Sequence, residues 1–231
     1  MNKSMVEKLL RKFEIFHDVS DTGLKPIIPL TKLRTQPKGT HVFFQDEPMT
    51  NVYFINWGKI KIYKTDLNGK EQIINVLTAG DMFPHQGFLE KGNYPAHAVV
   101  YEEAMLLYIP IKDFQNVLIE HPEICMKLLQ MQSRLIADLQ VRLGEKIMND
   151  TREQIIKLLL RLTQSHGDKL ENGNVLLTTP FTNQELANMI GSSRETVSRT
   201  LSNLRRRKMI YDDANGHIII DFHHLHEEAL Y

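Results

Sequence analysis

The sequence of 231 residues predicts an α+β protein in which a strand-rich N-terminal part, a long helix and a mixed C-terminal part follow one another. Between about residues 37 and 110, short apolar runs alternate with turn residues at a spacing of roughly 8–12 positions, which is typical of an all-β barrel or roll. From Asp113 to Met148 the apolar residues step by three and four, which predicts helix. Two short helical segments and a β-hairpin complete the pattern. We therefore expect domains at residues 1–112, 113–148 and 149–231.

Composition restricts the function before any motif is considered. The formal net charge is zero, so a DNA-binding surface must arise from local clustering of charge. The single cysteine, Cys125, excludes an internal disulfide and a multi-thiolate metal site, and it fits a reducing cytosol. The N-terminus lacks a signal-peptide core and no apolar run reaches about 18 residues. We expect a cytoplasmic protein with no membrane partner.

The first third of the chain contains the expected strands. Residues 1–34 are predicted to be helical, with breaks at Pro26 and Pro29. Asn56-Trp57-Gly58 is predicted to be a turn between two strands. Asn68-Gly69 predicts a two-residue hairpin turn, because both residues tolerate a positive φ. The predicted strands are 41–44, 52–55, 59–63 and 72–76.

A long helix follows, with a predicted break near His121-Pro122. The default interpretation of an apolar stripe is a helix packed on its own domain. Because this stripe lies between two domains and has the spacing of a coiled-coil seam, we expect a dimerisation helix. The stripe comprises Leu129, Gln132, Ile136, Leu139, Leu143 and Ile147.

Residues 181–208 carry the functional motif. Thr182 and Glu185 form a capping box that begins one helix, and Gly191 ends it. Ser192 or Ser193 caps the next helix, which we place at 194–207. A β-hairpin at 209–220, with its turn at Asn215-Gly216, completes a winged helix-turn-helix.

The second of these helices presents a polar outer face made of Arg194, Glu195, Ser198 and Arg199. Arginine donates two hydrogen bonds to guanine and glutamate accepts from cytosine, so this face predicts base reading in the major groove. Alternatively, Glu195 completes a capping box or pairs with Arg199, and the face is simply solvated.

Local charge supports DNA binding. Residues 194–208 contain six basic side chains and one acid, a local charge of +5 in a neutral chain. Basic side chains there suit phosphate contacts, although some of them could only complement the helix dipole. The predicted phosphate contacts are Thr182, Asn183, Gln184, Ser193, Thr196, Arg205 and Arg206.

The segment 192–199, Ser-Ser-Arg-Glu-Thr-Val-Ser-Arg, resembles the recognition helix of the Crp/Fnr regulators. Glycines at 39, 58, 69 and 80 also match the β-roll turns of that family. The resemblance implies a cyclic-nucleotide-binding-type β-roll, a long dimerisation helix and a C-terminal winged helix-turn-helix. It implies a homodimer on double-stranded DNA at a TGTGA-like inverted repeat, with RNA polymerase as partner, and it assigns base reading to Arg194, Glu195 and Arg199.

The effector residues of the resembled family carry over only in part. Its cyclic-AMP branch uses a Gly-Glu-Leu turn and an Arg-Ser-Ala segment, for which this chain has Gly80-Asp81-Met82 and Tyr94-Pro95-Ala96. Tyr94 thus replaces the arginine that neutralises the phosphate, which argues against cyclic AMP. Cys125 alone cannot supply the iron–sulfur cluster of the oxygen-sensing branch. The candidate pocket for an unidentified small-molecule effector comprises Gly80, Asp81, Met82, His85, Tyr94, Ala96 and His97.

The histidines raise the alternative of a metal site. His85 and His97 flank the candidate pocket, but a metal site usually needs three or four donors, so ordinary surface or core histidines are the preferred interpretation. We expect no cofactor, no metal and no catalytic residues. The rival functions are an effector-free regulator, a small-molecule or cyclic-nucleotide sensor with incidental DNA affinity, and a metal-dependent enzyme.

Overall fold

The computed structural model describes residues 3–89 and 92–229 and confirms the α+β architecture. The chain forms two compact units, the first extending to Asp138 and the second starting at Leu139. The division falls inside a long helix, α4 (Pro122–Met148). The domain limits predicted from the sequence stay predictions. In the described part of the chain, no helix is long and apolar enough to cross a membrane.

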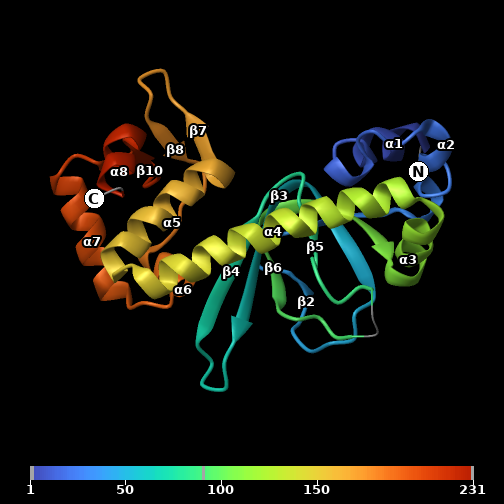
Figure 1. Cartoon of the computed structure of the whole chain (residues 1–231), viewed down its shortest axis with the longest axis horizontal. Helices are drawn as coiled ribbons and strands as arrows, with labels where there is room; N and C mark the ends of the chain where they lie inside the picture. Colours follow the sequence, from blue (N-terminus) through green and yellow to red (C-terminus); the bar gives the residue numbers. More distant parts are fainter. Residues whose placement is uncertain (1–2, 90–91, 230–231) are drawn as a thin grey trace. The chain divides into compact units, whose positions relative to one another are not determined.

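The first unit is an antiparallel sheet with short helices at one end (Figure 1). Its strand order is β1-β6-β3-β4, with β2 paired to β6 and β5 paired to β3. The prediction of helix up to residue 34 is wrong at its end, because residues 32–36 pair with β6. The elements are α1 (Lys3–Leu10), η1 (Glu14–Phe16), α2 (Asp21–Leu24), η2 (Ile28–Leu30), β1 (Lys32–Gln36), β2 (His41–Phe43), β3 (Asn51–Thr65), β4 (Glu71–Leu77), β5 (Met82–Phe83), β6 (His97–Pro110) and α3 (Ile111–Glu120).

The turn predicted at Asn56-Trp57-Gly58 is instead a bulge within one continuous strand, β3. The register of β3 against β6 shifts on both sides of Trp57. Gly58 has φ +92°, and a Cβ there would lie 2.2 Å from the Glu103 carbonyl oxygen. Glycine at this point therefore allows two long strands to bend together.

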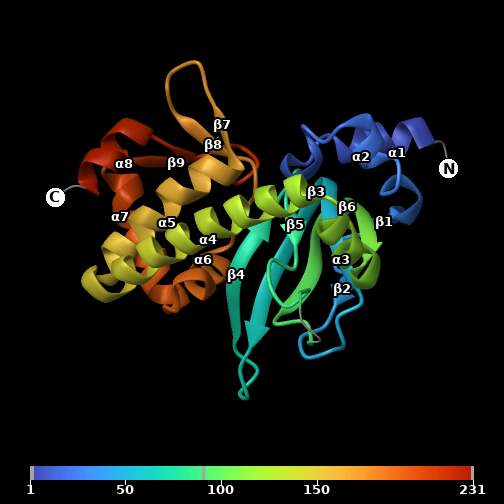
Figure 2. The same cartoon turned by 45° about the vertical axis from the view of Figure 1, so that its right-hand side comes forward.

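The Asn-Gly hairpins differ in detail from the predicted two-residue turn. Gly69 has a positive φ but Asn68 does not. The Asp66 carbonyl accepts a hydrogen bond from the Gly69 N–H, and the Asp66 N–H donates to the Lys70 carbonyl. The loop is therefore one residue longer, with glycine alone in the left-handed region. Figure 2 shows the β3–β4 hairpin extending beyond the other strands of this sheet.

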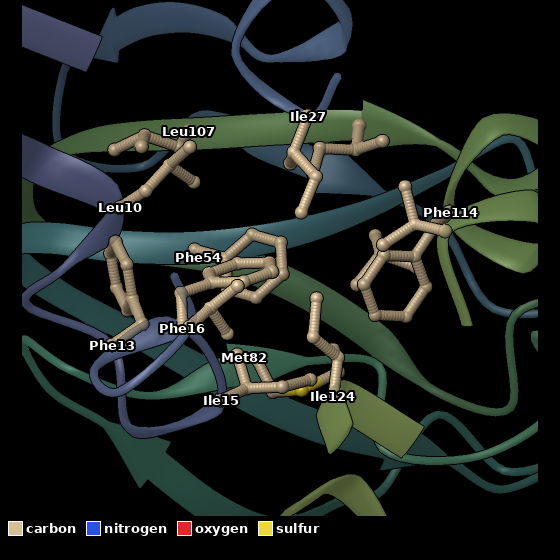
Figure 3. Close-up of a cluster of buried hydrophobic side chains, with 14 of the residues drawn as sticks. Leu10, Phe13, Ile15, Phe16, Ile27, Phe54, Met82, Leu107, Phe114 and Ile124 are labelled. Atoms are coloured by element: carbon tan, nitrogen blue, oxygen red, sulfur yellow. The ribbon is translucent and has the colours of Figure 1, made fainter. Parts of the chain in front are cut away.

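The helices pack on one face of the sheet around Phe54. Its ring lies 5.3 Å from the rings of both Phe13 and Phe16, and 6.1 Å from Phe114 (Figure 3). Ile124 of α4 joins the same buried cluster. Burial of these large rings anchors the N-terminal segment and the start of α4 to the sheet.

The predicted break at His121-Pro122 is confirmed, since α3 ends before His121 and α4 begins at Pro122. Only Ile124 and Leu128 of α4 are buried in this chain. The apolar stripe stays exposed along the rest of the helix, at Leu129, Ile136, Leu139, Leu143 and Ile147.

The second unit combines helices with a small antiparallel sheet of order β7-β8-β10-β9. Strand β7 was not predicted, because its sequence Gly-Asp-Lys is polar and it pairs only with β8. The elements are α5 (Thr151–His166), β7 (Gly167–Lys169), β8 (Val175–Leu177), α6 (Asn183–Ile190), α7 (Arg194–Arg206), β9 (Ile210–Asp212), β10 (Ile218–Ile220) and α8 (Phe222–Glu228).

Candidate nucleic-acid interface

The first helix of the motif, α6, begins and ends as predicted. The Thr182 hydroxyl accepts from the Glu185 N–H at 3.2 Å, and the Glu185 carboxylate accepts from the Thr182 N–H at 2.8 Å. Gly191 ends the helix with φ +68° and ψ +36°, the left-handed conformation that glycine adopts without strain. These local interactions fix the tight turn that separates α6 from α7.

The second helix, α7, is capped by Ser193, whose hydroxyl accepts from the Thr196 N–H at 3.2 Å. Val197, Leu201 and Leu204 are fully buried on its inner face. Ala187 of α6 is also fully buried, and its small side chain suits a close crossing of two helices. The motif is therefore a rigid pair of helices with one free face.

That free face lies on the N-terminal half of α7. Arg194, Glu195 and Arg199 are exposed, and Ser198 is half-buried between them and the core. Hydrogen bonds from its own backbone N–H and from the Ser193 hydroxyl hold the pKa of Glu195 below its ordinary value, and the charges of Arg194 and Arg199 act in the same direction. The face thus presents two cations and one ionised carboxylate, which suit guanine and cytosine edges respectively.

Five of the seven predicted phosphate contacts lie at two helix N-termini, and the other two, Arg205 and Arg206, lie at the end of α7. Thr182, Asn183 and Gln184 lie at the N-terminus of α6, where unpaired backbone N–H groups attract anions. Ser193 and Thr196 lie at the N-terminus of α7, with their hydroxyls 3.0 Å apart.

The basic cluster at the end of α7 is partly neutralised, which the local charge count did not reveal. Arg205 binds Asp212 of β9 through two hydrogen bonds, of 2.6 and 2.7 Å. Arg207 binds Glu228 of α8 at 2.5 and 2.6 Å. Both acids lie outside the counted segment 194–208, and the fold of β9 and α8 brings them to the two arginines. Arg206 remains exposed at the helix end.

Comparison with known proteins finds one family in both units. Residues 33–121 match the cyclic nucleotide-binding domain, and residues 153–228 match the Crp-like helix-turn-helix domain. The chain belongs to the Crp/Fnr family of transcriptional regulators. The family consists of transcription factors and not of enzymes, which excludes the rival function of a metal-dependent enzyme.

Relatives cover most of this chain. The CRP-like cAMP-activated global transcriptional regulator of Mycobacterium tuberculosis is 26% identical, over 97% of this chain and 100% of its own. The global nitrogen regulator of a Nostoc species is 27% identical over 85% and 86%, and the anaerobic regulatory protein of Bacillus subtilis is 26% identical over 81% and 79%. These names indicate different signals, so family membership alone assigns no effector.

Solved structures show the same fold. The c-di-GMP responsive global regulator CLP of Xanthomonas campestris has a TM-score of 0.74 at 17% identity, covering 87% of this chain and 99% of that one. A mutant of CooA from Carboxydothermus hydrogenoformans has a TM-score of 0.73 at 21% identity, covering 94% of each chain. The fold thus agrees with the domain matches and the relatives, which make this chain a DNA-binding transcriptional regulator of the Crp/Fnr family.

The residues of the candidate effector pocket do not all face one site in this Crp/Fnr regulator. Met82 belongs to the core between sheet and helices, whereas Tyr94 belongs to the core on the other side. Tyr94 is 2% exposed and its ring stacks on Phe43, with centroids 3.7 Å apart. Its hydroxyl accepts from the backbone N–H groups of Thr50 and Asn51, both at 3.2 Å. The ring and the hydroxyl of Tyr94 are therefore both engaged within this core.

Asp81 and His85 are neighbouring, largely buried groups near β5. Burial raises the pKa of Asp81, while hydrogen bonds from Thr78, one of them 2.7 Å long, and the charge of His85 oppose that rise. Burial lowers the pKa of His85, opposed by the charge of Asp81. The His85 carbonyl accepts a hydrogen bond from the Gln132 side chain of α4. Gly80 lies in the turn before them, and its N–H donates to the Ile55 carbonyl.

His97 lies in a different cluster, which the sequence did not predict. Its ring stacks on Tyr63 at 4.8 Å and lies 6.4 Å from His41, which is hydrogen-bonded to the Tyr63 hydroxyl at 3.0 Å. Ala96 is buried one residue earlier. Among the residues that the structure describes, no three His, Cys, Asp or Glu side chains are grouped as metal ligands.

One buried cation of the roll was also not predicted. The Arg34 guanidinium lies over the rings of Tyr53 and Tyr108, at 5.2 and 5.4 Å from their centroids. These distances are those of cation–π contacts. Because residues up to 34 were predicted to be helical, no sequence pattern placed Arg34 beside this aromatic core.

Proposed function

We propose that the protein binds a TGTGA-like inverted repeat as a homodimer, inserting α7 of each protomer into one major groove, and that it does so without cyclic AMP. The observation that carries the proposal is the exposed polar face of α7, where Arg194, Glu195, Ser198 and Arg199 lie together beyond a rigid apolar core. This is the region of a recognition helix that contacts base edges. We assign base reading to these four residues.

The exposed stripe of α4 supports the homodimer. Leu139, Leu143 and Ile147 are 47%, 61% and 74% exposed, at the spacing of a two-helix seam. A second copy of the helix is the partner whose stripe has the same spacing, and pairing would remove this apolar surface from water.

The candidate phosphate-binding residues differ in how strongly their surroundings favour an anion. Thr182, Asn183, Gln184, Ser193 and Thr196 flank two helix N-termini, where anions are favoured. At the other end of α7, Arg205 is held by Asp212, so Arg206 contributes more of the phosphate attraction than Arg205.

Cyclic-AMP independence rests on Tyr94. This residue brings no positive charge, and its ring and hydroxyl are both engaged within the core. A buried phosphate without a cationic partner is expensive to bind. An effector of other chemistry would act by favouring one arrangement of dimer helix and DNA-binding units.

In the cell we place the protein in the cytoplasm, where its position on a promoter relative to RNA polymerase sets its effect on transcription. The role in transcription that the relatives' names give supports this proposal, as does the single thiol, Cys125.

The proposal is tested by titrating purified protein onto a labelled duplex carrying two TGTGA half-sites in inverted repeat, at fixed salt, against a scrambled duplex of the same length. We expect selective binding that is equal with and without cyclic AMP. Selectivity only with the nucleotide contradicts the role given to Tyr94. Equal binding to both duplexes under both conditions contradicts the half-site, and favours a sensor with incidental DNA affinity.

A further inference from the structure

The second unit contains part of the dimer helix as well as the DNA-binding motif. The last turns of α4, from Leu139, belong to the same compact unit as α5 and α6. They carry Leu139, Leu143 and Ile147, the exposed end of the apolar stripe. The surface proposed to meet the partner and the surface proposed to meet DNA therefore belong to one compact body.

Lys146 connects these two surfaces. Its ammonium group donates to the Ile190 carbonyl at 2.6 Å and to the Gln154 side-chain oxygen at 3.3 Å. Ile190 is the last residue of α6, where unpaired carbonyls and the negative end of the helix dipole attract a cation. Lys146 thus ties the dimer helix to the turn between α6 and α7.

Glu145 makes a second connection on a different side of the same helix. Its carboxylate forms an ion pair with Arg161 of α5. Successive residues of an α-helix point about 100° apart around its axis. One contact alone would leave α4 able to rotate, whereas two contacts in different directions fix its rotation relative to the recognition helix.

We propose that Lys146 and Glu145 are positioning residues that set which half-site spacing the dimer accepts. This inference rests on the proposed function, because it needs two copies joined through α4. Each added base pair moves a half-site by about 3.4 Å along the DNA and turns it by about 35°, since one helical turn holds about 10 base pairs. A recognition helix held at a fixed angle to the seam cannot follow that movement, but a loosened one can.

The test compares a series of duplexes in which the two TGTGA half-sites are moved apart or together by single base pairs. The proteins are the full-length wild type, the double variant Lys146→Met with Glu145→Gln, and Lys169→Met as a matched loss of an exposed lysine in the same unit. For the wild type and Lys169→Met, we expect a shift of one base pair to weaken binding at least ~10-fold, because the heads are fixed. For the double variant, we expect the same shift of one base pair to weaken binding by less than ~3-fold.

Loss of the Lys146 charge also weakens attraction to phosphates, but this effect is equal at every spacing. It therefore leaves unchanged the ratio of the affinities for the preferred and the shifted spacing. Lys146→Arg retains a cation and should retain the sharp spacing preference. Thermal unfolding of each variant identifies any that fails to fold, in which case the single variant Glu145→Gln replaces it.

The outcomes separate the two proposals. If the double variant keeps the spacing preference of the wild type, the positioning role is wrong while the proposed function stands. If the wild type distinguishes neither TGTGA from scrambled sequence nor one spacing from another, the proposed function itself fails and the positioning role fails with it.

Discussion

Among single residues, the arginines of α7 differ in their exposure and in their ion-pair partners. Arg199 is exposed on the proposed base-reading face, Arg205 is bound to Asp212, and Arg206 is exposed at the helix end. Because charge alone does not distinguish these three side chains, their roles depend on position. Two substitutions can separate base reading from phosphate attraction.

Arg199→Ala should cost about 1–3 kcal/mol of binding to the preferred duplex and relax the preference at one base position. Arg206→Ala should weaken preferred and scrambled duplexes alike and reduce the slope of log affinity against log salt concentration by about 1. Titrations at several salt concentrations measure both effects. Identical behaviour of the two variants would contradict the assignment of the recognition face.

The largely buried His85 makes the stability of the β-roll depend on pH. Because burial lowers the pKa of His85, the unfolded chain takes up this proton at a higher pH than the folded chain does. The contribution of His85 is therefore fully present above its ordinary pKa of 6.5 and is lost as pH falls from there towards the folded pKa. The raised pKa of Asp81 has the opposite sign, since its contribution is lost as pH rises above the ordinary value of 3.8.

His85→Gln should therefore reduce the drop in Tm between pH of about 7.5 and about 5.5. His223→Gln, which removes an imidazole that is 79% exposed, serves as the control and should leave the drop unchanged. Thermal unfolding followed at both pH values measures the difference. A drop that is the same in His85→Gln as in the wild type would show that this burial has no effect on stability.

At the scale of elements, glycines with the same backbone conformation face different surroundings. Gly58 and Gly69 both have positive φ, of +92° and +77°. A Cβ on Gly58 would meet the backbone of Glu103 and Ala104 at 2.2 and 2.5 Å, whereas one on Gly69 would meet nothing within 4 Å. The first glycine is needed for close packing and for backbone conformation, the second for conformation only.

Gly69→Ala should reduce the free energy of unfolding by about 1 kcal/mol, the cost of placing a side chain in the left-handed region. Gly58→Ala should cost more, about 3 kcal/mol, because strand backbones must also separate. Denaturant unfolding of the two variants measures the difference. Equal losses would mean that β3 and β6 adjust without strain at the bulge.

At the scale of the whole molecule, the exposed stripe of α4 predicts the oligomeric state. Leu143 lies on the stripe and Val141 on the opposite side of the helix, yet their exposures are nearly equal, at 61% and 59%. In a monomer the two positions are equivalent, and in the proposed dimer only Leu143 is buried.

Leu143→Glu should raise the dimer dissociation constant at least ~100-fold, because two leucines lose burial worth about 1.5–3 kcal/mol each. Val141→Glu should leave it within about 3-fold of the wild type, as expected for a surface change. Sedimentation equilibrium over a range of concentrations measures both constants. A monomeric wild type, or equal effects of the two variants, would exclude this seam.

The sequence by itself determined the features that depend on neighbouring residues. The capping box of Thr182 and Glu185, the Gly191 turn and the break at His121 depend on contacts within about four positions, so their signals are local. The serine cap of α7 is also local, although the structure was needed to choose Ser193 over Ser192. The polar face of α7 follows from helical periodicity in the same way. These signals were sufficient for the fold class and for the resemblance to the Crp/Fnr family.

Only the tertiary structure decided the features that depend on distant partners. Local patterns indicated a turn at Gly58 and helix up to residue 34, but pairing with β6 makes residues 32–36 and the segment around Gly58 strand. The pairs Arg205–Asp212, Arg207–Glu228 and Lys146–Ile190 likewise join separate elements. These contacts between elements set which basic residues remain exposed and how α4 is attached to the turn between α6 and α7. No spacing rule predicts such contacts from the sequence, because they form only once the chain has folded.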